Sequence, residues 1–362
     1  TKGKNDEATL IIHCIPNGSL TGSTISAEMR QHGFSNIIDG MALFEAAFCL
    51  MNPDDGYESK NCLNSELCNW TNCERLLAYC ERDRGNVKQK QENGVVSFQV
   101  MDIILSTKCT LGCHDCGAHM NVYAEQGSAQ HIPYEQIKHD VNIFFDNVDT
   151  VAFVSVIGGE PFIYPEFNAV VSLLLEKPNF GVLGVTTSGI CKISQENLKV
   201  LKNNRVRVIF SDYTDALTEQ QKKLFNANVK KVRDFGIHYT VGKPVWATAP
   251  SLKHKSLSLT ELQSMKENCN SVKTCQAIQN GRLYPCSTSL AVNELNIDDY
   301  SADFVSLESN NLRSELRALK EKPYYDSCSR CTDGGQSVVM SGVQGRNNRF
   351  DHVFEGISIA VE

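Results

Sequence analysis

The sequence of 362 residues has no hydrophobic run that approaches a membrane-spanning helix, which takes about 20 apolar residues. It also has no excess of positive charge, because its formal net charge is -7. Nucleic acids and anionic membranes attract basic surfaces, so neither is expected as a general partner. The polar residues 1–7 lack the hydrophobic segment of a signal peptide. We therefore expect a cytoplasmic protein.

Cysteine, by contrast, is abundant, with 15 residues in the chain. The number is odd, the residues cluster, and no export signal is seen, which favours metal ligands over disulfides. A hydrophobic content of 41% and a charged content of 21% are those of a globular protein. The length allows two or three domains with a sizeable core.

Three cysteines, Cys109, Cys113 and Cys116, directly follow an expected buried strand over residues 97–105. Their C-x3-C-x2-C spacing is too tight for a set of disulfides, and a closed structural zinc site needs a fourth ligand. Three thiolates leave one iron of a cubane [4Fe-4S] cluster without a protein ligand. The spacing therefore predicts a metal centre with one open position, where chemistry can take place.

From about residue 95 the pattern alternates between strands and helices. Strands are expected at 97–105, 150–157, 181–186, 206–211 and 237–241, and helices at 134–147, 166–175, 195–202 and 218–236. Such alternation predicts an α/β fold with a parallel sheet covered by helices. Five or six units would make an open, partial (β/α)6-type barrel, with functional groups at the carboxyl ends of the strands.

Small polar or acidic residues follow three of these strands, at the same edge of the sheet as the three cysteines. They are Gly158, Gly159 and Glu160 after the second strand, Thr187 and Ser188 after the third, and Ser211 and Asp212 after the fourth. The glycines could let a ligand approach the backbone, and the glutamate could accept a hydrogen bond from an ammonium group. Each set alone is an ordinary turn or cap, but their common placement predicts one binding site.

The cysteine triad, followed one β/α unit later by Gly158-Gly159-Glu160, resembles the radical S-adenosylmethionine (SAM) superfamily over roughly residues 97–250. The resemblance implies that the three cysteines hold a [4Fe-4S] cluster whose open iron is chelated by the methionine part of SAM. It implies that Glu160 and the glycine backbone hold the SAM ammonium group. The residues after the third and fourth strands would contact the ribose and carboxylate. The reduced cluster would release a 5′-deoxyadenosyl radical, which abstracts hydrogen from the substrate.

The sequence departs from the family pattern at two places. The residue before the third cysteine is usually aromatic and packs on adenine, but here it is Asp115. The third strand usually ends in Thr-Asn-Gly and here reads Thr-Ser-Gly, at residues 187–189. Neither change removes a cluster ligand, although both affect the expected adenine and ribose contacts.

A second set of cysteines lies near the carboxyl end of the chain. It consists of Cys269, Cys275, Cys286, Cys328 and Cys331. The Asn280-Gly281 dipeptide predicts a hairpin just before Cys286, and a hairpin cysteine with a later C-x2-C could hold zinc or an iron–sulfur cluster. The spacing resembles the twitch domain, a shortened SPASM domain with one auxiliary [4Fe-4S] cluster. Four of the five cysteines would bind it, with Cys269 and Cys275 competing for one place.

The first part of the chain is expected to form a small β-α-β unit, with strands at 8–14 and 35–39 and a helix at 24–32. This pattern fits either a nucleotide-binding half-domain or a small α/β domain without a ligand. Four further cysteines could bind metal or stay unligated: Cys62, Cys68, Cys73 and Cys80. The predicted division is 1–94 for the amino-terminal unit and linker, 95–255 for the partial barrel and 256–362 for the twitch-like domain.

The substrate is indicated only by a wider resemblance, to radical SAM proteins associated with polysaccharide and sugar-nucleotide genes. It implies a small carbohydrate-like substrate that is dehydrogenated or epimerised, with the auxiliary cluster taking or giving an electron. It also implies a reducing partner such as flavodoxin or ferredoxin. Two alternatives stay open: a peptide-modifying enzyme of the kind that matures ribosomally made peptides, and a non-catalytic electron-transfer or metal-binding protein.

Overall fold

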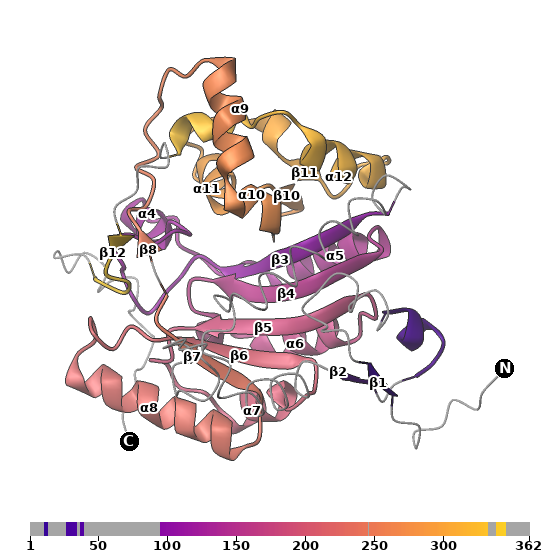
Figure 1. The fold of residues 1–362 in the computed structure, drawn as a ribbon. Helices are drawn as coiled ribbons and strands as arrows, with labels where there is room; N and C mark the ends of the chain where they lie inside the picture. Colours follow the sequence, from indigo (N-terminus) through magenta and orange to yellow (C-terminus); the bar gives the residue numbers. More distant parts are fainter. Residues whose placement is uncertain are drawn as a thin grey trace, which may run out of the picture.

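The computed structural model of the protein describes residues 11–13, 27–34, 37–39, 95–244, 246–331 and 338–344. Its centre is an eight-stranded sheet with the strand order β11-β10-β9-β3-β4-β5-β6-β7 (Figure 1). In the described part of the chain this sheet is open, with β11 and β7 at its two ends.

Five of the strands run parallel and alternate with helices, as the sequence predicts. The strands are β3 (Ser97–Ser106), β4 (Thr150–Gly158), β5 (Phe180–Thr187), β6 (Val206–Ser211) and β7 (Tyr239–Gly242). The helices between them are α5 (Tyr134–Asp146), α6 (Phe167–Leu175), α7 (Gln195–Leu201) and α8 (Glu219–Asp234). Every one of these elements begins and ends within two residues of its predicted limits. The α/β class is therefore confirmed.

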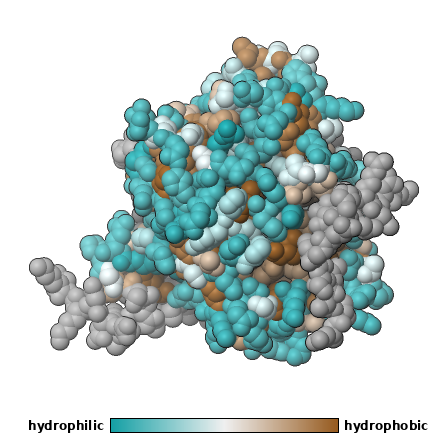
Figure 2. All heavy atoms as spheres, turned by 180° about the vertical axis from the view of Figure 1, so that it is seen from behind, coloured by the Kyte–Doolittle hydropathy of each residue, from teal (hydrophilic) through white to brown (hydrophobic). Residues whose placement is uncertain are grey.

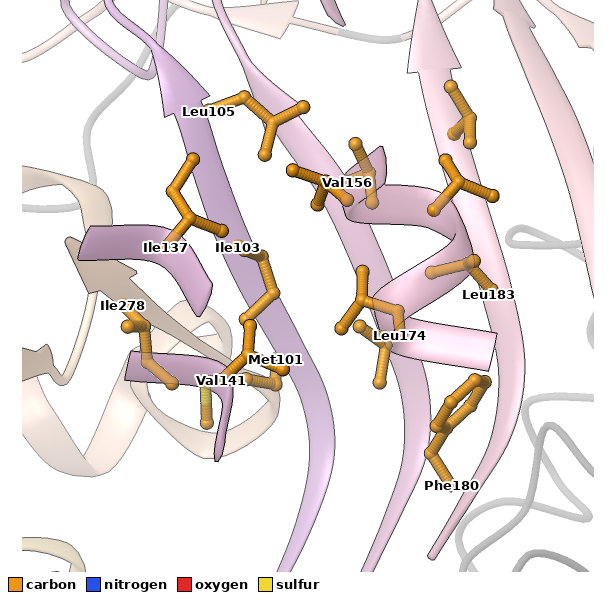
Figure 3. Packing of buried hydrophobic residues seen from close by; sticks show 14 of the residues in the cluster. Met101, Ile103, Leu105, Ile137, Val141, Val156, Leu174, Phe180, Leu183 and Ile278 are labelled. Atoms are coloured by element: carbon orange, nitrogen blue, oxygen red, sulfur yellow. The ribbon is translucent and has the colours of Figure 1, made fainter. Parts of the chain in front are cut away.

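The hydrophobic core lies between the sheet and these helices. Ile137 and Val141 of α5 pack against Met101 and Ile103 of β3, and Leu174 of α6 covers the neighbouring strands (Figure 3). These side chains come from alternate strand positions, so the sheet buries one face of β3 against helices. The helices start at defined points because capping boxes close the first turns of α7 and α8.

The carboxyl-terminal hairpin extends the same sheet. β9 (Cys275–Gln279) pairs antiparallel with β10 (Arg282–Tyr284), and the turn residues Asn280 and Gly281 have φ values of 51° and 74°. The predicted hairpin is therefore confirmed, with the left-handed conformations that an Asn-Gly turn favours. β9 also pairs in parallel with β3, and Ile278 joins the core beside Met101 (Figure 3).

Short helices and one further strand surround this hairpin. They are α9 (Leu259–Asn268), α10 (Asn270–Thr274), α11 (Ser287–Glu294), α12 (Leu312–Glu321) and β11 (Val305–Ser306). Figure 1 shows them gathered beside β3, next to the parallel half of the sheet. The hairpin thereby places residues that lie far along the sequence against the first strand of the barrel.

The described part of the amino-terminal segment has the predicted β-α-β order. β1 (Ile11–His13) and β2 (Ile37–Asp39) pair in parallel, with helical residues 27–31 between them. Arg30 Nη1 donates to the Phe180 carbonyl oxygen at 3.1 Å, at the amino end of β5. This unit therefore lies near the amino end of β5, with β1 and β2 drawn beside the parallel half of the sheet (Figure 1). The predicted cysteine site at residues 62–80 lies outside the described residues.

Polar residues cover most of the face shown in Figure 2, and hydrophobic residues form separate patches on it. Few large hydrophobic side chains of the described residues are exposed: Leu259, Val338, Met340 and Val343. Three of these belong to a strap, residues 338–344, whose strand β12 (Val338–Val339) pairs with β8 (Trp246–Ala247). None of the helices within the described ranges combines the length and the apolar character needed to cross a membrane.

Candidate active site

The cysteine triad lies on the loop after β3, at the carboxyl edge of the sheet. Burial raises the pKa of all three thiols, and that of Cys113 reaches about 12. Charge on Cys113 and Cys116 raises the pKa of Cys109 further. The three sulfurs are therefore close to one another. Backbone N–H groups point at them, from Leu111 toward Cys109 and from residues 118–120 toward Cys116.

This donor set fits an iron–sulfur cluster. The cysteines are free, and iron would stabilise the thiolate form that burial alone disfavours. Backbone N–H groups are the donors that thiolate ligands of such clusters accept, and they help to set the cluster potential. Because a closed set of four ligands is absent from this loop, one iron would stay open to another ligand.

The Gly158-Gly159 pair packs the end of β4 against the cysteine loop. The Gly159 N–H donates to the Ser106 carbonyl oxygen at 2.7 Å, and the Glu160 N–H donates to that of Lys108 at 3.0 Å. A Cβ atom on Gly159 would lie 1.7 Å from the Lys108 carbonyl oxygen. Glycine at position 159 therefore permits the close approach of the cysteine loop.

Glu160 is held at the centre of the site by residues from two strand ends. Its Oε1 accepts from Thr187 Oγ1 at 2.7 Å and from the Phe162 N–H at 3.3 Å. Its Oε2 accepts from the N–H and Oγ of Ser188 at 3.0 and 2.6 Å. With 1% of its surface exposed, the Glu160 carboxyl group is buried within electrostatic reach of Cys109. The structure thus brings together the predicted residues after β4 and β5.

Cys191 also lies beside Glu160, although no sequence motif predicted this. Its pKa is raised by burial first and then by Glu160, whose carboxylate accepts a hydrogen bond from the thiol. Charge on Cys109 also raises this pKa. A lone cysteine in a loop carries no motif, so only the tertiary structure reveals this contact.

The residues after β6 form hydrogen bonds within their own loop. Asp212 Oδ1 accepts from the Thr214 N–H and Oγ1, at 2.9 and 2.5 Å, and so shapes its own loop. Ser211 hydrogen-bonds to Tyr213, whose pKa is raised by burial and by the charges of the cysteine triad. Tyr213, which the sequence did not single out, is therefore the residue of this loop that neighbours the triad.

The strap, residues 338–344, covers the cysteine loop from outside. The His114 N–H donates to the Val343 carbonyl oxygen at 2.8 Å, and Cys113 forms an antiparallel bridge with Gln344. A Cβ atom on Gly342 would lie 2.6 Å from the Tyr213 ring. Asp115, which replaces the usual aromatic residue, accepts at 3.1 Å from the Ala249 N–H. The strap and the Ala249 N–H thus hold the cysteine loop from segments that are distant in sequence.

The second set of cysteines separates into a group of four and one residue apart. The group is Cys269, Cys286, Cys328 and Cys331. Burial raises the pKa of Cys286, and charge on the other three raises it further. The Ser289 N–H donates to the Cys286 sulfur at 3.4 Å, at the start of α11. Cys275 instead donates to Asp102 Oδ2 at 2.9 Å, although it remains within electrostatic reach of Cys286.

Within the described ranges, no three Cys, His, Asp or Glu side chains are arranged to hold a single metal ion. A zinc site needs its ligands to converge on one ion at short distances. A cubane cluster binds each thiolate at a different iron, so its ligands stand further apart. The group of four has the residue types that either zinc or an iron–sulfur cluster takes as ligands.

A comparison with protein-family models supports the resemblance that the cysteine triad suggested. Residues 103–238 match the family model described as Radical SAM superfamily. No curated protein matches the sequence.

Three solved structures are among those to which the chain is similar. BtrN in complex with AdoMet and 2-DOIA is 12% identical with a TM-score of 0.38, covering 67% of this chain and 98% of that one. Streptococcus suis SuiB bound to S-adenosylmethionine is 16% identical with a TM-score of 0.42, covering 86% and 83%. Native anSMEcpe with bound AdoMet is 12% identical with a TM-score of 0.44, covering 71% and 96%.

Proposed function

From the radical SAM domain that the chain carries over residues 103–238, we propose that this protein is an enzyme that cleaves SAM reductively. The 5′-deoxyadenosyl radical that this cleavage releases would abstract hydrogen from the substrate. The observation that carries this proposal is the packing of Glu160 against the cysteine loop, which fixes a buried carboxylate beside Cys109. An open cluster iron and an acceptor for an ammonium group would then lie side by side.

The residues of the site would divide the work as follows. Cys109, Cys113 and Cys116 would hold the cluster, which supplies the electron for SAM cleavage when it is bound. Glu160 would accept from the SAM ammonium group. Thr187 and Ser188 orient Glu160, because their hydroxyls donate to its two oxygens. They are thus proposed as positioning residues for Glu160. The contacts of Thr187, Ser188, Ser211 and Asp212 with the ribose and carboxylate of SAM remain a proposal.

Glu160 has little spare capacity to accept a further hydrogen bond. A carboxylate offers about four acceptor sites, and the donors already present are Thr187, Phe162, Ser188 with two groups, and Cys191. A ligand ammonium group is charged, and a charge-assisted hydrogen bond is roughly twice as strong as a neutral one. SAM would therefore displace a hydroxyl or thiol donor when it binds.

The direct test is the formation of 5′-deoxyadenosine. The protein is reconstituted with iron and sulfide, reduced with dithionite under anaerobic conditions and given SAM. It is then expected to release 5′-deoxyadenosine. Cys113→Ala should abolish this release, because the cluster loses one of its three ligands. The proposal fails if wild type forms no 5′-deoxyadenosine, or if the variant forms as much.

For the substrate, we propose a small carbohydrate-like alcohol that is dehydrogenated or epimerised. The second cluster, on the group of four cysteines, would take or give the electron that such a reaction requires, and flavodoxin or ferredoxin would supply reducing electrons. The alternative is modification of a peptide. The two differ in product: a new carbonyl or an inverted carbon in a sugar, against a change in mass or stereochemistry of a peptide residue. The division at residues 94 and 255 remains a proposal.

The separation of Cys275 from the group of four gives a prediction about iron content. Cys269→Ala is expected to lower the iron of the reconstituted protein by about four per chain, because a cubane cluster loses a ligand. Cys275→Ala should leave the iron content unchanged, since Cys275 bonds to Asp102 instead. Iron and sulfide analysis of both variants checks this. The reverse result would make Cys275 the ligand.

A further inference from the structure

The sheet face that α5 and α6 leave uncovered carries an unusual row of residues. Asp102, Ser155, Gly184 and Arg207 stand in register on four neighbouring strands, in the order β3, β4, β5 and β6. Asp102 and Arg207 are half-buried, whereas Met101 and Val208, on the helix-covered face, are fully buried. Charged residues are rare in the middle of buried strands. Their position predicts a role for this open face.

Asp102 is poised to accept a further hydrogen bond. Its Oδ2 accepts from the Cys275 thiol at 2.9 Å, and the Ser155 hydroxyl also donates to the carboxylate. Burial raises the pKa of Asp102 to about 6, so the carboxylate form predominates at neutral pH. Two neutral donors occupy about half of its roughly four acceptor sites. A hydroxyl group that reaches this face could therefore bind to Asp102.

The middle of the row is apolar. A Cβ atom on Gly184 would lie 2.2 Å from the Phe153 ring, so this ring fills the place of a side chain between Ser155 and Arg207. Neighbouring strands lie about 4.8 Å apart, so the backbones of Asp102 and Arg207 are separated by roughly 14 Å. The face therefore carries an acid, an aromatic ring and an arginine in sequence. This arrangement suits a small cyclic polyol with an apolar ring face and polar edges.

Cys275 connects this face to the second group of cysteines. Its thiol bonds to Asp102, and it stands within electrostatic reach of Cys286. Cys275 thus neighbours both the Asp102 carboxylate and Cys286, one of the four cysteines proposed to bind the auxiliary cluster. A proton acceptor and a one-electron acceptor, an iron–sulfur cluster by class, would flank a substrate bound on the open face.

We propose that Asp102 accepts the hydroxyl proton of an alcohol bound on the open face of the sheet, an inference that rests on the proposed function. Loss of a hydrogen atom from the carbinol carbon leaves a carbon radical that still carries its hydroxyl group. The O–H bond then breaks, its proton passes to Asp102, and one electron leaves to the iron–sulfur cluster. The C–O bond becomes a carbonyl, Asp102 ends protonated, and the acceptor ends reduced by one electron.

The first test needs no turnover and uses the cluster-loaded protein. Cys275 is alkylated with iodoacetamide at pH 8, and its rate is followed by peptide mass spectrometry. Asp102→Asn should alkylate at least roughly fivefold faster than wild type, because the carboxylate raises the pKa of the thiol. Asp146→Asn, an exposed carboxylate at the end of α5, should match wild type. Equal rates for Asp102→Asn and wild type would overturn the pairing and the proposal.

The second test measures turnover with scyllo-inositol, glucose and glucosamine as probes. Wild type is expected to form a carbonyl product from at least one of them, and Asp102→Asn should form roughly 100-fold less product per 5′-deoxyadenosine. Equal product from the variant overturns the proposal. So does wild type that makes 5′-deoxyadenosine but oxidises none of the probes, which leaves the radical function intact. Absence of 5′-deoxyadenosine from wild type overturns the proposed function itself.

Discussion

Gly159→Ala is expected to displace the cysteine loop and to cost about 3 kcal/mol of stability, a typical upper value for overpacking. The added Cβ would lie 1.7 Å from the Lys108 carbonyl oxygen and 2.9 Å from the Cys109 nitrogen. Both are backbone atoms, which cannot move aside as a flexible side chain can. We expect the variant to bind less iron and to form no 5′-deoxyadenosine. Urea unfolding and iron analysis measure the two effects.

Gly117→Ala is the matched control, because Gly117 lies on the same loop, directly after Cys116. A Cβ atom on Gly117 meets nothing within 4 Å, and the residue is exposed. This variant should keep the stability and iron content of wild type. If Gly159→Ala behaved like Gly117→Ala, the contact between β4 and the cysteine loop would not position the triad.

Glu160→Gln should weaken SAM binding roughly 10- to 100-fold, since hydrogen bonds to a charged group contribute about 1.5–3 kcal/mol. The amide nitrogen would replace an oxygen that now accepts, so it would face the N–H of either Phe162 or Ser188. The amide NH2 group and this backbone N–H are both donors, so neither would have an acceptor in this buried site. We therefore expect a loss of stability of about 2 kcal/mol as well. Equilibrium dialysis with SAM and urea unfolding measure these effects.

Glu166→Gln is the control for this change, because Glu166 is exposed and its side chain does not cap α6. It should alter neither SAM affinity nor stability. Unchanged SAM binding by Glu160→Gln would show that the ammonium group is held elsewhere. A loss of stability without a loss of affinity would leave Glu160 as a structural carboxylate only.

Much of the fold could be predicted because its elements have local causes. The parallel strands are Val- and Ile-rich runs, and their helices begin at capping residues such as Ser194 and Thr218. Asn280-Gly281 specifies its turn through two left-handed backbone conformations. The place of the hairpin was not predictable in this way. That β9 pairs with β3 depends on residues more than 170 positions apart in the sequence.

In the candidate site, too, the residues with a local sequence signal were predictable and the others were not. The triad and Glu160 were found from the sequence, because closely spaced cysteines and a Gly-Gly-Glu strand end keep their chemical meaning in any fold that places them at one edge. Cys191, Tyr213 and Asp102 were not found, since each acquires its role from a neighbour on another strand or loop. Composition and residue spacing do not reveal which residues become neighbours when the chain folds.

The sequence by itself determined the parallel α/β architecture and the donors for an open iron–sulfur site, because hydrophobic periodicity and ligand spacing are local properties of the chain. Only the tertiary structure decided how these donors are supported and what surrounds them. In the folded chain, Glu160 accepts hydrogen bonds from the hydroxyls of Thr187 and Ser188, and Cys269 lies near Cys286, as do Cys328 and Cys331. Folding also brought Cys275 to Asp102, because β9 joined the edge of β3 and turned that side chain toward the open face.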